Sequence, residues 1–336
     1  MASLIILALI FTLTNGLHDA SSVVATMVAC RAATPKQAVI IASVFGLLGT
    51  LFSGSLVADT VSKIIKVAPG TELMYILVAA ILGAVIWNVV TWRLGLPSSS
   101  THALIGGLIG AAWVSKGPNY ILWGGSELVN GSHELTGIIK VIVALVLSPL
   151  LGFILAFIIQ KTSTLLLRNA KYKINENINK IQWIFAAALA FSHGSNDSQK
   201  ITGLIYLAII SAGITASTNT HYIVKLFVGA LMFLGTALGG WRIMRTLGRG
   251  IYDLRPIHSL NSMLSSGFSI IFATFTGAPV STTHVVVGSI MGVGAADEYR
   301  MVNWGIGKEI ISAWFITIPC SAFSSAIIYA IMSLGV

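Results

Sequence analysis

The sequence is dominated by long apolar runs that recur from one end of the chain to the other. Most of them are close to the ~20 residues that an α-helix needs to cross about 30 Å of hydrocarbon. The clearest are Ala38–Val57, Leu73–Val90, Ile138–Ile159, Tyr222–Gly240 and Ile310–Ile331. Only 9% of the residues are charged, too few to solvate the surface of a soluble domain. The chain is therefore predicted to be an all-α integral membrane protein, since a transmembrane β-barrel would show shorter, alternating segments.

Basic residues are concentrated in a few short polar segments. One block lies in the stretch 161–182, a second lies at 242–255, and Arg31 and Lys36 flank a short loop. By the positive-inside rule these segments are expected to face the cytoplasm of a multi-pass cell-membrane protein and to contact anionic lipid. Segment 115–135 is not basic and is a candidate external loop. The net charge of +9 is thus interpreted as a topology signal, and no nucleic-acid partner is predicted.

Two polar motifs each occur twice, once in each half of the chain. In chain order the four copies are Asn15–Asp19, Pro97–His102, His193–Asp197 and Pro279–His284. The motifs keep their order on either side of the polar stretch, which indicates an internal repeat. We therefore predict a first transport repeat at 1–160, a cytoplasmic basic linker at 161–182 and a second transport repeat at 183–336.

The apolar runs next to these motifs are short. Each aspartate motif lies between two runs that are individually too short to span a membrane, so an interrupted helix is expected there. Gly16 and Gly194 are expected to let that helix unwind. The runs after the serine motifs, 103–114 and 285–293, suit re-entrant or half-membrane segments. Interrupted segments at matching places in two halves are typical of the midplane site of a secondary transporter.

The two aspartates are predicted to bind a cation or a proton. A carboxylate at membrane depth costs roughly 2.5–3.5 kcal/mol on insertion scales, so Asp19 and Asp197 each need a partner. Asn15 and Asn196 supply amide oxygens nearby, and hard cations such as sodium take carboxylate, amide and carbonyl oxygens. The alternative is an aspartate that caps a helix at the membrane surface, and the repetition of the motif argues against it.

The serine and threonine motifs favour an anion. A proline followed by hydroxyl residues is typical of a helix start. A helix N-terminus presents free N–H groups and a positive dipole end, which suit a phosphate-like anion. Two such starts that meet at mid-membrane would surround a tetrahedral oxyanion. The candidate ligands are Ser99, Ser100, Thr101, Ser281, Thr282 and Thr283. Ordinary capping and hydrogen bonding between helices is the alternative.

The motifs also contain basic side chains. Their four histidines, which could handle protons or form structural hydrogen bonds, are His18, His102, His193 and His284. Lys200 could pair with a carboxylate, attract the anion or extend to the membrane interface. The sequence leaves these alternatives open.

At these residues the chain resembles the PiT family of inorganic phosphate transporters, over essentially its whole length. The family signature reads roughly G-A-N-D-V-A-N-A and occurs twice. Segment His193–Lys200 keeps its core, whereas Asn15–Ser22 has histidine in place of the first asparagine. Where the second asparagine often stands, the two copies have Ser22 and Lys200. The histidine form resembles the bacterial and archaeal Pit branch.

The resemblance implies an inverted repeat, two re-entrant hairpins, a homodimer and symport of phosphate with sodium ions or protons by alternating access. It implies phosphate ligands from the serine and threonine set above. It also implies that Asp19, Asn196 and Asp197 coordinate the cation, a sodium ion if sodium is coupled, with Asn15 nearby. The accessory candidates are His18, Ser22, Gln199 and Lys200. No cofactor is expected beyond the transported ions, and the expected fold has about 10–12 transmembrane helices.

Other functions are less consistent with the residues. Sulfate is fully ionised at neutral pH and donates no hydrogen bond, whereas phosphate can donate one to Asp19 or Asp197. A channel would not need an anion site in both halves. An intramembrane hydrolase is disfavoured because Ser281 and His284 lack a G-x-S-x-G elbow. The chain is therefore predicted to be a transporter and not an enzyme, with a sulfate permease as the alternative.

Overall fold

The structure is a computed structural model that describes residues 1–125, 135–215, 218–239, 244 and 246–334. Its main helices are α1 (Ala2–Ala29), α2 (Pro35–Leu51), α4 (Thr71–Leu94), α5 (Ser100–Lys116), α7 (Gly137–Leu166), α8 (Ile174–Ser211), α9 (Thr218–Leu238), α11 (Pro256–Phe275), α12 (Thr282–Glu298) and α13 (Trp304–Leu334). Shorter turns are α3 (Leu56–Ser62), η1 (Pro118–Tyr120), η2 (Thr246–Gly250) and η3 (Tyr299–Met301). Parts of the expected external loop (126–134) and of the second basic block (242, 243 and 245) lie outside the described residues.

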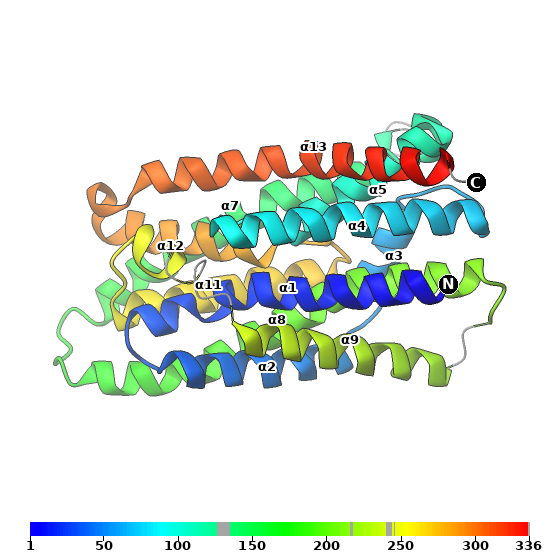
Figure 1. The fold of residues 1–336 in the computed structure, drawn as a ribbon. Coiled ribbons are helices and arrows are strands. Elements are labelled where there is room, and N and C mark those ends of the chain that lie inside the picture. The colour runs from blue at the N-terminus through cyan, green and yellow to red at the C-terminus, as the bar shows by residue number, and fades with distance from the viewer. Residues whose placement is uncertain (126–134, 216–217, 240–243, 245, 335–336) are drawn as a thin grey trace.

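The helices of the two halves follow the same order. The helices α1, α2, α4, α5 and α7 are matched in sequence by α8, α9, α11, α12 and α13. In Figure 1, α1 runs from the N-terminus on the right towards the left, whereas α8 runs from left to right. The pair α7 and α13 is opposed in the same way. These two matched pairs of helices therefore run in opposite directions.

The two halves interlock instead of forming separate units. Helix α7 of the first half packs on α12 of the second, and α13 packs on α5. In the same way α2 packs on α8, and α1 packs on α9. The buried apolar residues form two clusters, each with side chains from both halves. Each half therefore supplies apolar surface that completes the core of the other.

The helices that carry the aspartates are continuous, so the expected interruption is wrong. Helices α1 and α8 run without a break through both motifs. A Cβ atom on Gly16 would lie 2.7 Å from the backbone oxygen of Met232 in α9. One on Gly194 would lie 2.1 Å from the backbone oxygen of Gly46 in α2. These glycines allow two helices to cross at close range, and this packing explains their presence without any unwinding.

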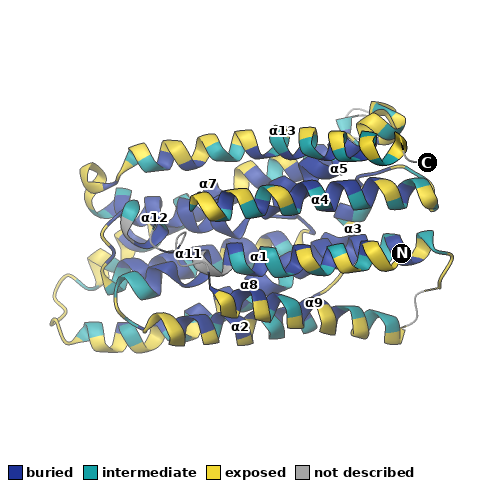
Figure 2. Cartoon of the chain, viewed as in Figure 1, coloured by how far each residue is buried: buried dark blue, intermediate teal, exposed yellow. Residues whose placement is uncertain are grey.

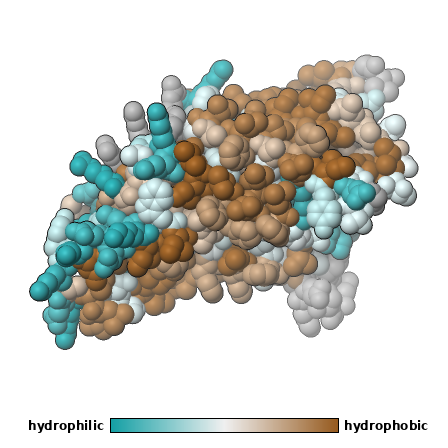
Figure 3. Space-filling view, turned by 90° about the horizontal axis from the view of Figure 1, so that it is seen from below, coloured by the Kyte–Doolittle hydropathy of each residue, from teal (hydrophilic) through white to brown (hydrophobic). Residues whose placement is uncertain are grey.

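The surface of the bundle supports the membrane prediction. Exposed side chains lie on the outer helices, while α5, α12 and the later part of α8 are largely buried (Figure 2). The face in Figure 3 carries a broad apolar surface, with polar side chains gathered towards the ends. Large apolar side chains such as Phe227 of α9 and Phe315 of α13 are exposed. The prediction of an all-α membrane protein is therefore confirmed.

Five of the described helices are long and apolar enough to cross a membrane, namely α1, α4, α7, α9 and α13. The number is six if α2 and α3, which are bent by 76°, form one span. Length and apolarity thus identify fewer spans than the roughly 10–12 expected. One reason is that α8 and α11 bury many polar side chains. Another is that α5 and α12 have only 17 residues each.

The polar stretch 161–182 is mostly helical. Helix α7 continues to Leu166 and α8 begins at Ile174, so only 167–173 connects the two halves. This connection lies at the left end of the bundle in Figure 1.

Candidate functional site

Two helices begin inside the bundle and lead to opposite ends of it. Helix α5 runs towards η1, and α12 runs towards the start of α13 (Figure 1). Their N-caps are Ser99 and Ser281, whose hydroxyls accept hydrogen bonds from the backbone N–H of His102 (3.1 Å) and His284 (3.4 Å). The imidazole rings of His102 and His284 are 4.6 Å apart. The sequence predicts two helix starts that meet inside the membrane, and the structure brings them together.

Asp19 joins these two helix starts. Its Oδ2 accepts a hydrogen bond from the hydroxyl of Ser100 in α5, at 2.8 Å. Its Oδ1 accepts one from the hydroxyl of Thr283 in α12, at 3.0 Å, and lies 3.1 Å from Nδ1 of His18. The hydroxyl of Ser22 donates to the backbone oxygen of Asp19 at 2.7 Å. The first carboxylate thus contacts a helix start from each half of the chain.

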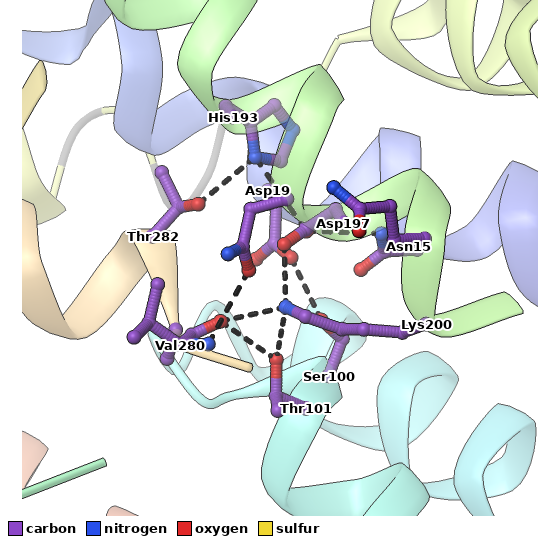
Figure 4. A network of polar contacts seen from close by, with 12 residues as sticks. Asn15, Asp19, Ser100, Thr101, His193, Asp197, Lys200, Val280 and Thr282 are labelled. Carbon is purple, nitrogen blue, oxygen red and sulfur yellow. Dashed lines mark hydrogen bonds and ion pairs between the residues drawn. The ribbon is translucent and has the colours of Figure 1, made fainter. Parts of the chain in front are cut away.

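Asp197 has a different set of partners (Figure 4). Its Oδ1 lies 2.6 Å from the ammonium of Lys200, and its Oδ2 accepts a hydrogen bond of 3.2 Å from the amide of Asn15. The same ammonium donates to the hydroxyl of Thr101 and to the backbone oxygen of Val280, both at 2.6 Å. Of the alternatives that the sequence leaves open for Lys200, the structure favours pairing with a carboxylate.

The remaining hydroxyls lie in the same region. The hydroxyl of Thr101 donates to the backbone oxygen of Val280 at 3.0 Å. The hydroxyl of Thr282 is 2.9 Å from Nδ1 of His193, which is itself 3.5 Å from Oδ2 of Asp197. The six predicted phosphate ligands are all buried, and they are Ser99, Ser100, Thr101, Ser281, Thr282 and Thr283.

Asn196 and Gln199 turn to other partners. The amide of Asn196 donates to the hydroxyl of Thr274 (2.9 Å) and to the backbone oxygen of Ala278 (3.2 Å). Its oxygen accepts a hydrogen bond from the backbone N–H of Val280 at 3.3 Å. Asn196 therefore shapes the loop before α12. Gln199 bonds the backbone of Ser195 and of Val57, which links α8 to α3.

Some residues of the site are not predicted by the sequence. Nε2 of His18 lies 3.2 Å from the hydroxyl of Ser98, which donates to Thr91 at 2.9 Å. Ser98 belongs to a repeated motif and could have been chosen for that reason. Thr91 belongs to no repeated motif. Val280 acts through its backbone carbonyl, so the valine side chain gives no indication of this role in the sequence.

His102 and His284 stand at matching positions of the two serine motifs, just after the hydroxyl residues that begin α5 and α12. The ring of His284 stacks on that of Trp314, with 3.7 Å between ring centroids. Nδ1 of His102 and both ring nitrogens of His284 have no hydrogen-bond partner among the described residues. His102 also lines a cavity of about 400 Å³ between α7 and α13, whose other lining side chains are apolar. The rings of His102 and His284 therefore have mainly aromatic and apolar neighbours.

The chain is similar to phosphate transporters over nearly its full length. The model of the phosphate transporter family matches residues 15–176 and 165–325. A protein of Bacillus subtilis described as a probable low-affinity inorganic phosphate transporter is 39% identical, and the alignment covers 98% of this chain and 96% of the relative. One of the same description from Rhizobium meliloti is 38% identical, with 98% and 95% covered.

More distant similarities agree with these. A putative phosphate permease of Pyrococcus horikoshii is 28% identical over 95% of this chain and 94% of the relative. A solved structure described as the sodium-dependent phosphate transporter superposes with a TM-score of 0.84 at 26% identity, covering 99% of this chain and all of that one. These relatives are described as transporters or permeases, and the prediction of a transporter rather than an enzyme is confirmed.

Proposed function

This chain belongs to the phosphate transporter family, as its motifs predict, and we propose that it is a secondary active symporter of inorganic phosphate. The coupling ion is sodium or a proton, and the mechanism is alternating access. One observation carries the proposal most directly. The starts of α5 and α12 meet in the interior, and their hydroxyls on Ser100 and Thr283 converge on the carboxylate of Asp19.

The phosphate site would consist of the two helix starts. Their N–H groups and hydroxyls are donors, and the positive ends of both helix dipoles favour an anion there. The hydroxyls of Ser100, Thr101, Thr282 and Thr283 each have a partner that a phosphate oxygen would replace on binding. Asp19 is an acceptor for a phosphate hydrogen, which sulfate lacks at neutral pH. The proposed substrate is therefore phosphate, with sulfate as the competitor to test.

The coupling cation would bind at the carboxylates. Asp19 is 3% exposed, so its negative charge lies away from water and needs a positive partner. The oxygen atoms that could coordinate the cation belong to carboxylate, hydroxyl and carbonyl groups, which suit a hard cation. A cation and a phosphate that bind together would offset each other's charge, which lowers the electrostatic cost of moving the loaded site.

The cellular setting completes the proposal. We place the protein in the cell membrane as a homodimer, with its basic segments in the cytoplasm and in contact with anionic lipid. The connection 167–173, which has Arg168, Lys171 and Lys173, would then be cytoplasmic.

Uptake into liposomes tests the proposed function. The purified protein would be reconstituted, and radiolabelled phosphate uptake would be measured under a sodium gradient and, separately, under a pH gradient. We expect uptake under at least one gradient, with little competition from sulfate. A Ser312→Ala variant, which removes an exposed hydroxyl of α13 that donates to the backbone oxygen of Lys308 in the same helix, is a matched control for the site hydroxyls. Absence of uptake under both gradients contradicts the proposal, and stronger inhibition by sulfate than by phosphate changes the substrate.

A further inference from the structure

The ammonium of Lys200 has the surroundings of a bound cation. It donates to a carboxylate oxygen of Asp197, a hydroxyl oxygen of Thr101 and a carbonyl oxygen of Val280, each at 2.6 Å (Figure 4). An ammonium has three N–H donors and no acceptor, so all three are used. The three oxygens come from α8, from α5 and from the segment just before α12. They are also the oxygen types that a hard metal cation would take.

The first half has no lysine at the equivalent position. Ser22 follows Asp19 by the same number of residues as Lys200 follows Asp197, and its hydroxyl donates to the backbone oxygen of Asp19 in its own helix. Thr283, the counterpart of Thr101, donates directly to Asp19 at 3.0 Å. Around Asp197, the Lys200 ammonium lies between this carboxylate and Thr101. The two half-sites therefore differ by one fixed positive charge.

The buried charges lead to the same conclusion. Among the buried residues that the structure describes, those with a formal charge are Asp19, Asp197, Lys200 and Lys225. Lys225 lies on α9 and donates to the backbone oxygen of Ser53. At the site itself, two carboxylates thus face one ammonium and two imidazoles, with Nδ1 of His18 3.1 Å from Asp19 and Nδ1 of His193 3.5 Å from Asp197. One more positive charge would neutralise the pair of carboxylates, and it would bind at Asp19 as a mobile cation or as a proton taken up by Asp19 or His18.

We propose that Lys200 is a tethered cation that permanently fills the cation position of the second half and so reduces by one the number of coupling ions per phosphate. This inference rests on the proposed symport. A tethered charge moves with the protein and is never released, so it adds nothing to the driving force. Each ion that is coupled multiplies the attainable phosphate accumulation by that ion's concentration ratio. Lys200 thus lowers the phosphate gradient that the transporter can build, while the second half-site needs no ion.

The number of coupled ions can be measured at the balance point of transport. Proteoliposomes at zero membrane potential are given a fixed gradient of the ion, sodium or proton, that drives uptake by the unmodified protein. The phosphate gradient that stops net flux then gives the number of coupled ions. We expect Lys200→Ser, which copies the first half, to couple one additional ion. Under a tenfold ion gradient, its balancing phosphate gradient should be about tenfold steeper.

Two further variants act as controls. Lys200→Gln keeps much of the side-chain length without the charge and should couple the same additional ion as Lys200→Ser. Lys225→Ser removes another buried lysine and should leave the number of ions unchanged. Active position-200 variants whose ion number equals that of the unmodified protein overturn the inference, while phosphate symport itself stands. If the unmodified protein moves no phosphate under either gradient, the proposed function fails instead.

A stability measurement covers the case of inactive variants. The thermal unfolding of purified Lys200→Ser would be followed in sodium chloride, in choline chloride and at lower pH. A mobile cation should replace the missing ammonium, so sodium or acidification should stabilise this variant more than it stabilises the Lys225→Ser control. If neither sodium nor acidification stabilises it selectively, even when the variant folds poorly, Lys200 has a structural role and the inference is wrong.

Discussion

The half-site around Asp19 and the half-site around Asp197 have the same scaffold but different chemistry. Each aspartate lies at a matching place on a continuous helix, beside the start of a helix that begins inside the bundle. Asp19 takes hydroxyls from Ser100 and Thr283, whereas Asp197 takes the ammonium of Lys200 and the amide of Asn15. A repeated fold therefore does not imply two equal sites. A few side chains are enough to give one carboxylate a fixed ammonium partner and the other hydroxyl and imidazole partners.

Removing the carboxylate of the first half-site should have the largest effect. Asp19→Asn keeps the shape but deletes the charge that has no fixed ammonium partner, and we expect coupled phosphate uptake to fall at least about 100-fold, equivalent to ~2.7 kcal/mol. Initial rates of phosphate uptake in proteoliposomes measure this. Asp59→Asn, at an exposed position of α3, is the control and should transport normally. Retention of coupled uptake by Asp19→Asn would remove this carboxylate from the mechanism.

Removing matched hydroxyls from the two helix starts should have the next largest effect. The effects at the two starts should be unequal. Ser100 donates to a carboxylate, whereas its counterpart Thr282 contacts the imidazole of His193. Hydrogen bonds to charged groups are worth about 1.5–3 kcal/mol and neutral ones about 0.5–1.5 kcal/mol. A phosphate oxygen would replace a carboxylate partner at Ser100 but an imidazole partner at Thr282, so the empty site loses a stronger bond in Ser100→Ala. We therefore expect Thr282→Val to raise the half-saturating phosphate concentration about tenfold, and Ser100→Ala to raise it less. Equal effects would show that the two helix starts are functionally equivalent, and a larger effect of Ser100→Ala would contradict this exchange of partners.

The glycines at the helix crossings should affect stability unequally. A Cβ on Gly194 would lie 2.1 Å from a backbone oxygen, compared with 2.7 Å for Gly16. Backbone atoms cannot move aside cheaply, so we expect Gly194→Ala to destabilise by about 1–3 kcal/mol and Gly16→Ala by less. Thermal unfolding in detergent measures the difference. Gly54→Ala, where a Cβ would meet nothing within 4 Å, is the control, and a result in which all three variants melt alike would contradict the packing argument.

The smallest effect is expected at Ser22, the counterpart of Lys200. Its hydroxyl bonds the backbone oxygen of Asp19 three residues earlier, which the helix satisfies in any case. Ser22→Ala should therefore leave phosphate uptake within about twofold, since such a bond is worth only ~0.5 kcal/mol. The measurement is the same uptake assay. A large loss would mean that the hydroxyl contacts an ion during transport.

Much of the site was predictable because polar residues at membrane depth are costly and here occur twice. That argument correctly places Asp19, Asp197 and the hydroxyl residues in one buried region. It fails for the glycines, because a glycine that unwinds a helix and a glycine that lets two helices cross look the same in sequence. Only the neighbouring backbone, Gly46 for Gly194, distinguishes them.

Other parts of the site depend on tertiary contacts that no local pattern records. The backbone oxygen of Val280 and the direction of Lys200 are examples. Asn196 shares a motif with Asp197, yet its hydrogen bonds lie with the loop before α12. Length and apolarity identify only five or six of the described helices as membrane spans for a related reason. Helices α8 and α11 bury many polar side chains, so their polar faces contact neighbouring helices in place of lipid.

The packing of α7 on α12 and of α13 on α5 has a consequence for the synthesis and insertion of the protein. The ribosome completes the first half well before it makes the helix on which α7 packs. Until α12 and α13 are made, the nascent first half therefore lies in the bilayer with the packing surfaces of α5 and α7 uncovered.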